Sequence, residues 1–192
     1  QGELDTANNW LERIVDDNPL FLPAYDVLAD NWDKRGDSKA TQKTVERAVE
    51  VSPMSILRQK RLASVAKDNN DAKSSIEALR KTVKLGKLSC YGTPEDSFNF
   101  AREVSEAIEN DVELPVKVSA EAIEILQEVD GQFHRSDEER TQCAMLTARI
   151  HANEGRSDTA YELLQEGVDD EECGIDVDVD RVYALLVLGE QS

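Results

Sequence analysis

The side chains most able to do chemistry in this chain are two histidines and three cysteines: His134, His151, Cys90, Cys143 and Cys173. Reactive groups usually converge with perturbed partners in one pocket, and no Ser or Cys with the logic of a catalytic triad accompanies either histidine. The five residues never fall at the C-x2-C or H-x3-H spacing of a zinc site. We therefore expect no catalytic residue and no metal centre among them.

An acidic triplet offers a second candidate for metal chemistry. Asp176, Asp178 and Asp180 alternate as at the start of a calcium loop,. Arg181 replaces the glycine that such a loop needs, and Val187 stands where its closing glutamate belongs. The alternative is an acidic segment that places favourable negative charge at the N-terminus of a following helix. No glycine-rich phosphate loop occurs either, so we expect no cofactor.

The charge of the chain limits its partners. It has 192 residues with 40 acidic and 22 basic side chains, a formal net charge of −18. Nucleic acid and anionic lipid both need a positive footprint, so we expect neither as a partner. The charge is uneven: residues 54–93 carry nine bases and three acids (net +6), whereas residues 94–192 carry seven bases and 26 acids (net −19). Such asymmetry bears on partner choice and self-association.

The compartment follows from what the sequence lacks. Three widely spaced cysteines indicate no disulfide framework, which favours a reducing cytoplasm. No apolar run approaches the roughly 18 residues that a membrane span needs. The first residues, Gln1-Gly2-Glu3, show neither Met nor a signal-peptide pattern, so we expect an excised piece of a longer protein,.

The elements that would position any site recur at a constant offset along the chain. The three copies read Gly2, Ala7, Leu11, Ile14, Pro19; Gly36, Thr41, Val45, Ala48, Pro53; and Asn70, Ser75, Leu79, Thr82, Lys87. Gly or Asn permits a tight turn, small residues allow close helix packing, and apolar residues three and four apart form a buried stripe. Proline then stops the helix and begins the next unit.

A second pattern completes each unit. Tyr25, Leu28, Ala29 and Trp32 precede Gly36 at the spacing of the first helix of a tetratricopeptide repeat (TPR), W-x2-L-G-x2-Y,. The chain thus resembles the TPR family, which implies an all-α solenoid of antiparallel helix pairs in a right-handed superhelix. We expect about ten helices, the first of which lacks its partner because that partner lies upstream of residue 1.

The repeat changes along the chain, and we expect three segments in one continuous solenoid. Residues 1–87 form TPR repeats, 88–131 a divergent helical hairpin, and 132–192 a TPR-like hairpin with a capping helix at 182–188. In the last two segments we expect helices to start at a Thr93–Asp96 cap, at Pro115 and at a Ser136–Glu139 capping box,. The first of these helices should bury a stripe of Phe98, Ala101, Val104 or Ser105, and Ile108, and the second a stripe of Ala122, Ile125, Leu126 and Val129. We expect His151 to be a partly buried packing residue.

A narrower resemblance covers roughly residues 1–110. The stretches 52–62, 85–89 and 93–96 are similar to the output region of bacterial response regulators in which a receiver domain precedes a TPR array. The resemblance implies that the phospho-acceptor aspartate lies in a missing N-terminal part. This chain would then pass the signal of a two-component phosphorelay to a partner protein.

We expect the partner to bind in the concave groove lined by first helices. The candidate groove residues are Asp26, Asp30, Asp33, Lys60, Arg61, Ser64 and Lys67. The acids would face the bases across neighbouring helices. This surface of mixed charge would select a peptide by the order of the charged side chains along it. Some TPR domains capture C-terminal carboxylates with a clamp of Asn and Lys side chains. Here the repeat before the basic helix has acids at the matching positions, so we expect this clamp to be absent.

Three interpretations of function remain. The first is a non-enzymatic signalling scaffold that binds a protein or peptide. The second is an assembly module that forms a homo-oligomer through its basic segment and acidic C-terminal half. The third, an enzyme, has only the two lone histidines in its favour. For the groove residues, the alternative is an ordinary solvated helix face.

Overall fold

The computed structural model describes residues 2–115, 117–131 and 136–166, and every regular element in these ranges is an α-helix. The helices are α1 (Gly2–Asp17), α2 (Leu22–Lys34), α3 (Ser38–Val51), α4 (Ile56–Asp68), α5 (Ala72–Gly86), α6 (Pro94–Glu109), α7 (Val118–Asp130), α8 (Asp137–Asn153) and α9 (Ser157–Glu166). The all-α prediction is confirmed. The tenth predicted helix, at 182–188, lies outside the described residues.

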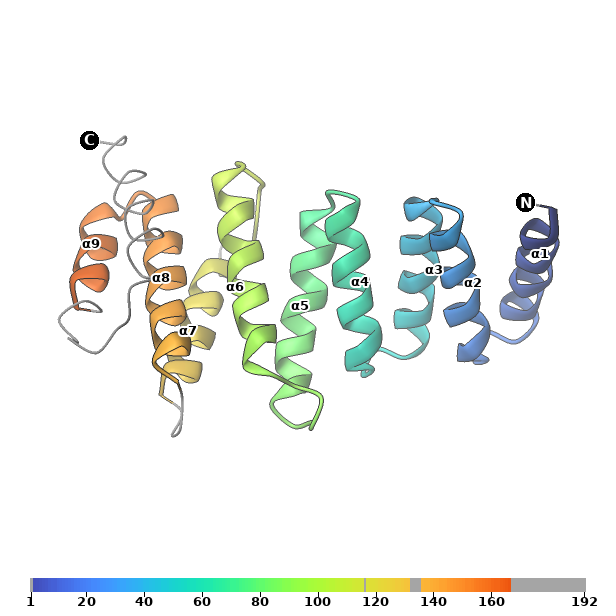
Figure 1. Ribbon diagram of the computed structural model, residues 1–192, viewed down its shortest axis with the longest axis horizontal. Coiled ribbons are helices and arrows are strands. Elements are labelled where there is room, and N and C mark those ends of the chain that lie inside the picture. The colour runs from blue at the N-terminus through green and yellow to red at the C-terminus, as the bar shows by residue number, and fades with distance from the viewer. Residues whose placement is uncertain (1, 116, 132–135, 167–192) are drawn as a thin grey trace. The chain divides into compact units, whose positions relative to one another are not determined.

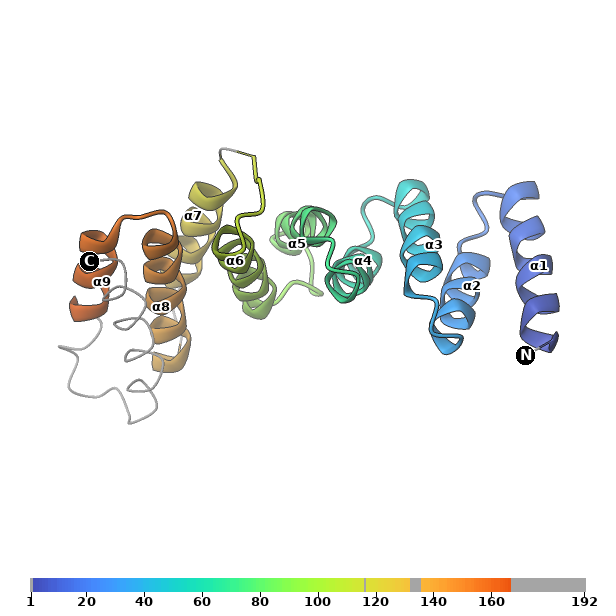
Figure 2. The ribbon, with the colours of Figure 1, turned by 90° about the horizontal axis from the view of Figure 1, so that it is seen from above.

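The chain divides into two compact units between Gly92 and Thr93. In the first unit, α2 pairs with α3 and α4 pairs with α5 as antiparallel hairpins (Figure 1). Seen from above, α4 and α5 lie side by side (Figure 2). The turns inside both hairpins lie at one edge of this unit, and the loops α1–α2 and α3–α4 lie at the other (Figure 1).

One type of turn follows four of the described helices. Gly36, Asn70, Asp111 and Gly155 have φ values of +75°, +57°, +54° and +77°. In each case the next amide bonds back to a carbonyl five residues earlier, as in Asp37 N to Trp32 O at 3.0 Å and Asp71 N to Ala66 O at 2.8 Å. This is the left-handed helix ending that Gly and Asn allow at low steric cost.

An aspartate that the sequence patterns did not point to caps the helix after two of these turns. The Asp37 carboxylate accepts from Ala40 N at 3.0 Å, and its equivalent in the next repeat, Asp71, accepts from Ser74 N at 3.2 Å. Burial alone would raise the pKa of the Asp71 carboxyl, but hydrogen bonds from Ser74 and Gln42 hold it below its ordinary value. Both helices therefore begin at a fixed residue, which sets the register of their buried faces.

Consecutive hairpins in the first unit are joined by one apolar cluster, which we call the shared core. Its members come from α2, α3, α4 and α5: Ala29, Val45, Val49, Leu62, Ala63 and Ala78, with Leu79 packed against them. Three of the six are alanines, which let helix backbones approach closely. The predicted stripe residues Val45 and Ala48 are both 3% exposed, as the repeat pattern requires.

Helix α1 packs against α2 through a second cluster that holds Val15, Ala24, Tyr25 and Ala48. The buried side chain of Asn31 also donates to Asn8 at 2.9 Å. Ile14, however, is 39% exposed, so its predicted buried position is wrong, although its equivalent in the next repeat, Ala48, is buried. The difference arises because the backbone of α3 packs closely against both α2 and α4, whereas among the described helices only α2 packs closely against the backbone of α1.

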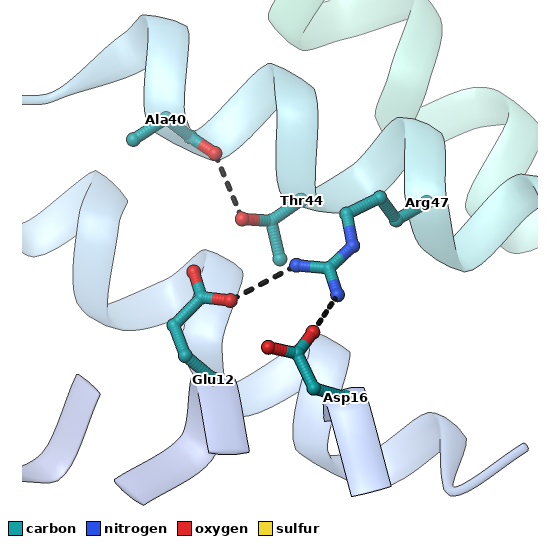
Figure 3. Close-up of polar contacts among 5 residues, drawn as sticks. All are labelled: Glu12, Asp16, Ala40, Thr44 and Arg47. Atoms are coloured by element: carbon teal, nitrogen blue, oxygen red, sulfur yellow. Dashed lines mark hydrogen bonds and ion pairs between the residues drawn. The ribbon is translucent and has the colours of Figure 1, made fainter. Parts of the chain in front are cut away.

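A cationic side chain connects α1, α2 and α3. The Arg47 guanidinium reaches Glu12 at 2.9 Å and Asp16 at 2.8 Å, both on α1 (Figure 3). It also lies over the Tyr25 ring, 5.5 Å from the centroid. Burial alone would lower the pKa of Arg47, but the bonds to Glu12 and Asp16 raise it. These ion pairs are partly exposed, so their value is modest, but they orient α1 on α3 where apolar contact is thin.

In the second unit, α6 packs against both α7 and α8, and α8 packs against α9. Phe98, Phe100 and Val104 fill the interior from α6. Polar bonds connect α8 to α6: Asn153 donates to the Ser105 carbonyl at 3.0 Å, and Arg149 pairs with Glu109 at 2.7 Å. The predicted inward residues of α7 are all buried: Ala122, Ile125, Leu126 and Val129.

The predicted helix starts of this unit are confirmed with one exception. Asp96 accepts from Thr93 N at 2.9 Å, and Ser136 and Glu139 exchange two bonds of 3.1 and 3.2 Å. Pro115 does not open α7, which begins at Val118. Its carbonyl accepts from Val118 N at 3.0 Å, so the proline forms the turn before the helix.

Leu28 tests the register of α2. It has no exposed surface. We expect Leu28→Ala to lower the free energy of unfolding by about 2–5 kcal/mol in urea titrations, because the change leaves a cavity. Val27→Ala is the matched control: Val27 is 48% exposed, and its truncation should cost less than about 0.5 kcal/mol,. Equal losses in the two variants would show that the register is wrong.

Candidate protein-binding face

The buried faces of α2 and α4 determine which of their side chains point outward. Leu28 and Ala29 of α2, and Leu62 and Ala63 of α4, are buried. Because a helix turns about 100° per residue, charged residues between these positions lie on the remaining faces. The face formed by the outward residues of α2 and α4 is called the α2–α4 face below.

Two arginines of α4 pair with two carboxylates of α2 across this face. Arg58 reaches Asp26 at 2.7 Å, and Arg61 reaches Asp30 at 2.6 Å. The structure therefore brings Asp30 and Arg61 together as the sequence suggested. The partner of Asp26 is Arg58, a residue of the basic helix outside the predicted groove set.

The other predicted groove residues lie in different places. The Lys60 ammonium donates to the Tyr91 carbonyl at 3.1 Å, so this side chain reaches the loop after α5. Asp33, Ser64 and Lys67 are exposed toward the turn end of their helices. The sequence patterns placed Lys60 opposite the acids of α2 and did not anticipate its contact with this loop.

In both ion pairs the negatively charged side chain is more exposed to solvent than the positively charged one. The side chains of Asp26 and Asp30 are 43% and 55% exposed, whereas those of Arg58 and Arg61 are 20% and 30% exposed. The guanidiniums lie beneath and hold the carboxylates in place, and each carboxylate keeps lone pairs for further donors. The α2 part of the face therefore favours cationic or N–H donor groups.

Two exposed apolar side chains adjoin the paired residues in the sequence and were not predicted: Val27 follows Asp26, and Leu57 precedes Arg58. Val27 is 48% and Leu57 is 63% exposed. The Arg58–Asp26 pair was not predicted either. The sequence could have indicated it, because α2 has acids and α4 has bases at nearly equivalent repeat positions, and such positions lie on matching helix faces. Side chains of this type could anchor a partner whose charged groups meet Asp26 and Asp30.

The residues first considered for catalysis and metal binding do not converge in the described part of the chain. His151 lies half-buried on α8, Cys143 is buried and Cys90 is exposed. No group of three potential metal ligands occurs among the described residues. His134, Cys173 and the Asp176–Asp180 triplet lie outside them. No helix in the described ranges combines the length and apolar character needed to cross a membrane.

His151 is a half-buried packing residue whose Nδ1 is shielded from water. Burial, and next the nearby Arg156, lower the pKa of its imidazole, while Glu154 opposes them. Its buried Nδ1 has no hydrogen-bond partner within the described ranges. These features suit the predicted structural role on α8.

Helical hairpins that recur with a period of about 34 residues and turn at Gly or Asn define a TPR-type helical repeat fold. The solved structure of MamA protein is similar: it shares 14% identity, with 91% of this chain and 89% of that chain covered and a TM-score of 0.52. The TPR-like repeats of a Podosopora anserina kinesin light chain share 19% identity, with 86% of each chain covered and a TM-score of 0.54. No protein-family model and no curated protein matches the sequence. At these identities the likeness is one of fold.

We expect His151 to make the chain less stable in mild acid. Its folded pKa lies below the unfolded value of about 6.5, so the unfolded state takes up the proton first,. The stability that depends on a neutral His151 is fully present above a pH of about 6.5 and is lost as the pH falls toward the folded pKa. Urea unfolding from pH 7.5 to 5 should therefore show a smaller loss of stability in His151→Gln than in the parent. Parallel pH profiles would contradict this.

Proposed function

We propose that this chain is a protein-interaction module and that a segment of a partner protein binds along the α2–α4 face. The observation that carries the proposal is the pair of exposed carboxylates, Asp26 and Asp30, each held by an arginine beneath it. Groups fixed in this way lose little side-chain freedom when a partner binds. The TPR-type fold is consistent with such a role, although a fold alone does not establish function.

The face suits a segment that carries cationic side chains and at least one apolar side chain. Lysine or arginine groups of the partner would bond to the outer lone pairs of the carboxylates. Val27 and Leu57 would receive the apolar groups. Arg58 and Arg61 are engaged with α2, so capture of a C-terminal carboxylate by a free cationic clamp is not the mode that we propose.

Charge removal on α2 tests the proposal. The chain is used as bait in a quantitative pull-down, and each retained protein is measured against an Asp26→Asn, Asp30→Asn variant. We expect the true partner to bind the parent and to lose about tenfold or more in affinity with the variant, since two charge-assisted contacts are removed.

The matched control carries Asp17→Asn and Glu50→Gln. Both residues are exposed acids on α1 and α3, so the control has the same net charge as the test variant without a change to the α2–α4 face. Helical circular dichroism confirms that both variants are folded. A partner that binds all three proteins equally would refute binding at this face.

The cellular setting forms a further part of the proposal. The similarity of residues 1–110 to response-regulator output regions supports a place downstream of a receiver domain, with the whole protein in the cytoplasm. The sequence of the intact gene product decides this point: a phosphorylatable α/β domain ahead of these repeats supports it, and the absence of such a domain removes it.

Self-association is the alternative, favoured by the charge asymmetry. Residues 54–93 carry net charge +6 and residues 94–192 carry −19. A dimer held by these charges would weaken as salt screens them. Size measurement by light scattering at low and high ionic strength separates the two functions: a salt-sensitive dimer favours assembly, and a monomer at both favours partner binding.

A further inference from the structure

Helix α1 exposes two large apolar side chains on one side. Trp10 is 58% and Ile14 is 39% exposed. The two residues are four apart, so they lie on one side of the helix, and Ala7 continues that side toward the N-terminal end,. We call these three residues the open side of α1. The buried residue Val15, through which α1 packs into the first unit, lies on a neighbouring side.

The positions of the open side are buried in the next two repeats. The equivalents of Ala7, Trp10 and Ile14, at offsets of one and two repeats, are Thr41, Thr44 and Ala48 on α3 and Ser75, Ala78 and Thr82 on α5. All six side chains are between 0% and 3% exposed. Among α1, α3 and α5, the repeat therefore leaves these positions open to solvent only on α1.

The preceding helix of the same hairpin covers these positions on α3 and α5. Ala48 of α3 lies in one cluster with Tyr25 of α2. Ala78 of α5 lies in one cluster with Leu62 of α4, and among the described helices α5 packs closely against α4 alone. In both hairpins the covering helix comes directly before the covered one and runs antiparallel to it (Figure 1). The open side of α1 thus matches a surface that the repeat buries against a helix.

A glycine stands at the repeat position where such a helix would turn into α1. Gly2 is the equivalent of Gly36 and Asn70, at which the chain turns from the first helix of a hairpin into the second with φ of +75° and +57°. In this chain Gly2 begins α1, and neither a close contact nor a positive φ requires a glycine there. A hairpin turn like the other two would require a residue that tolerates positive φ.

We propose that in the intact protein the open side of α1 binds an amphipathic α-helix that leads into Gly2 and completes the first hairpin. This helix takes the place relative to α1 that α2 takes relative to α3. Trp10 and Ile14 are larger than their equivalents Thr44 and Ala48. Close packing therefore requires small side chains, such as Ala or Gly, where the covering helix meets them.

Hydroxyl-radical footprinting, read by mass spectrometry, tests the proposal on the intact gene product and on the 192-residue chain. We expect Trp10 and Ile14 to be oxidised in the 192-residue chain and to lose most of this oxidation in the intact protein, because a packed helix interface excludes water. Met54, which is 74% exposed in the α3–α4 loop, is the internal reference and should be oxidised equally in both proteins.

A substitution shows whether the covering helix stabilises the fold. Trp10→Gln should lower the melting temperature of the intact protein by several degrees, because it removes a buried contact there, and should hardly change that of the 192-residue chain. Leu20→Gln is the matched control: Leu20 is 78% exposed in the loop that follows α1, and its substitution should leave both melting temperatures unchanged.

Equal oxidation of Trp10 in the two proteins would overturn the proposal, as would an intact gene product in which no helix-forming segment leads into Gly2. Protection of Trp10 that grows with protein concentration would also overturn it, since the occupant would then be a second copy of the chain. Binding at the α2–α4 face depends on Asp26 and Asp30 and is measured with their own variants, so the two proposals fail independently.

Discussion

The shared core is the constraint on which the first unit depends. A pair of helices has an apolar side that it cannot cover by itself, and Ala29, Val45, Leu62 and Ala78 cover one another only because two hairpins contribute to one cluster,. The cluster fixes α4 relative to α2, and two arginines of α4 reach the carboxylates of the neighbouring hairpin. The outward charge pattern is therefore a consequence of inward packing.

Features that depend on nearby residues could be predicted from the sequence. The turns at Gly36, Asn70 and Gly155, the Ser136–Glu139 box and the buried stripes follow from local chemistry and a helical period,.

Features that depend on distant contacts could not be predicted in this way. The exposure of Ile14 depends on which helices cover α1, and the contact of Lys60 depends on how the loop after α5 closes through Gly86 and Gly92. The Asp37 and Asp71 caps, by contrast, are local: each aspartate accepts from an amide three residues later, so the sequence carried their signal,.

The same repeat presents opposite chemistry at two places in one unit. Along α2 the arginines lie beneath the carboxylates, so the exposed groups are mainly acceptors. At the end of α4 and α5, lysines and apolar side chains are exposed together. The net charge of −18 therefore does not describe each face, because local rather than total charge decides a contact,.

Hydrogen–deuterium exchange on a Leu62→Ala variant tests the shared core most directly. Leu62 belongs to α4 but packs with residues of α2 and α3. We expect faster exchange in residues 22–34 and 38–51 as well as in 56–86, because a hairpin that loses its neighbour's apolar contacts opens more often. Leu57→Ala, on the exposed side of the same helix, should change little. Faster exchange confined to residues 56–86 would contradict a core shared between the hairpins.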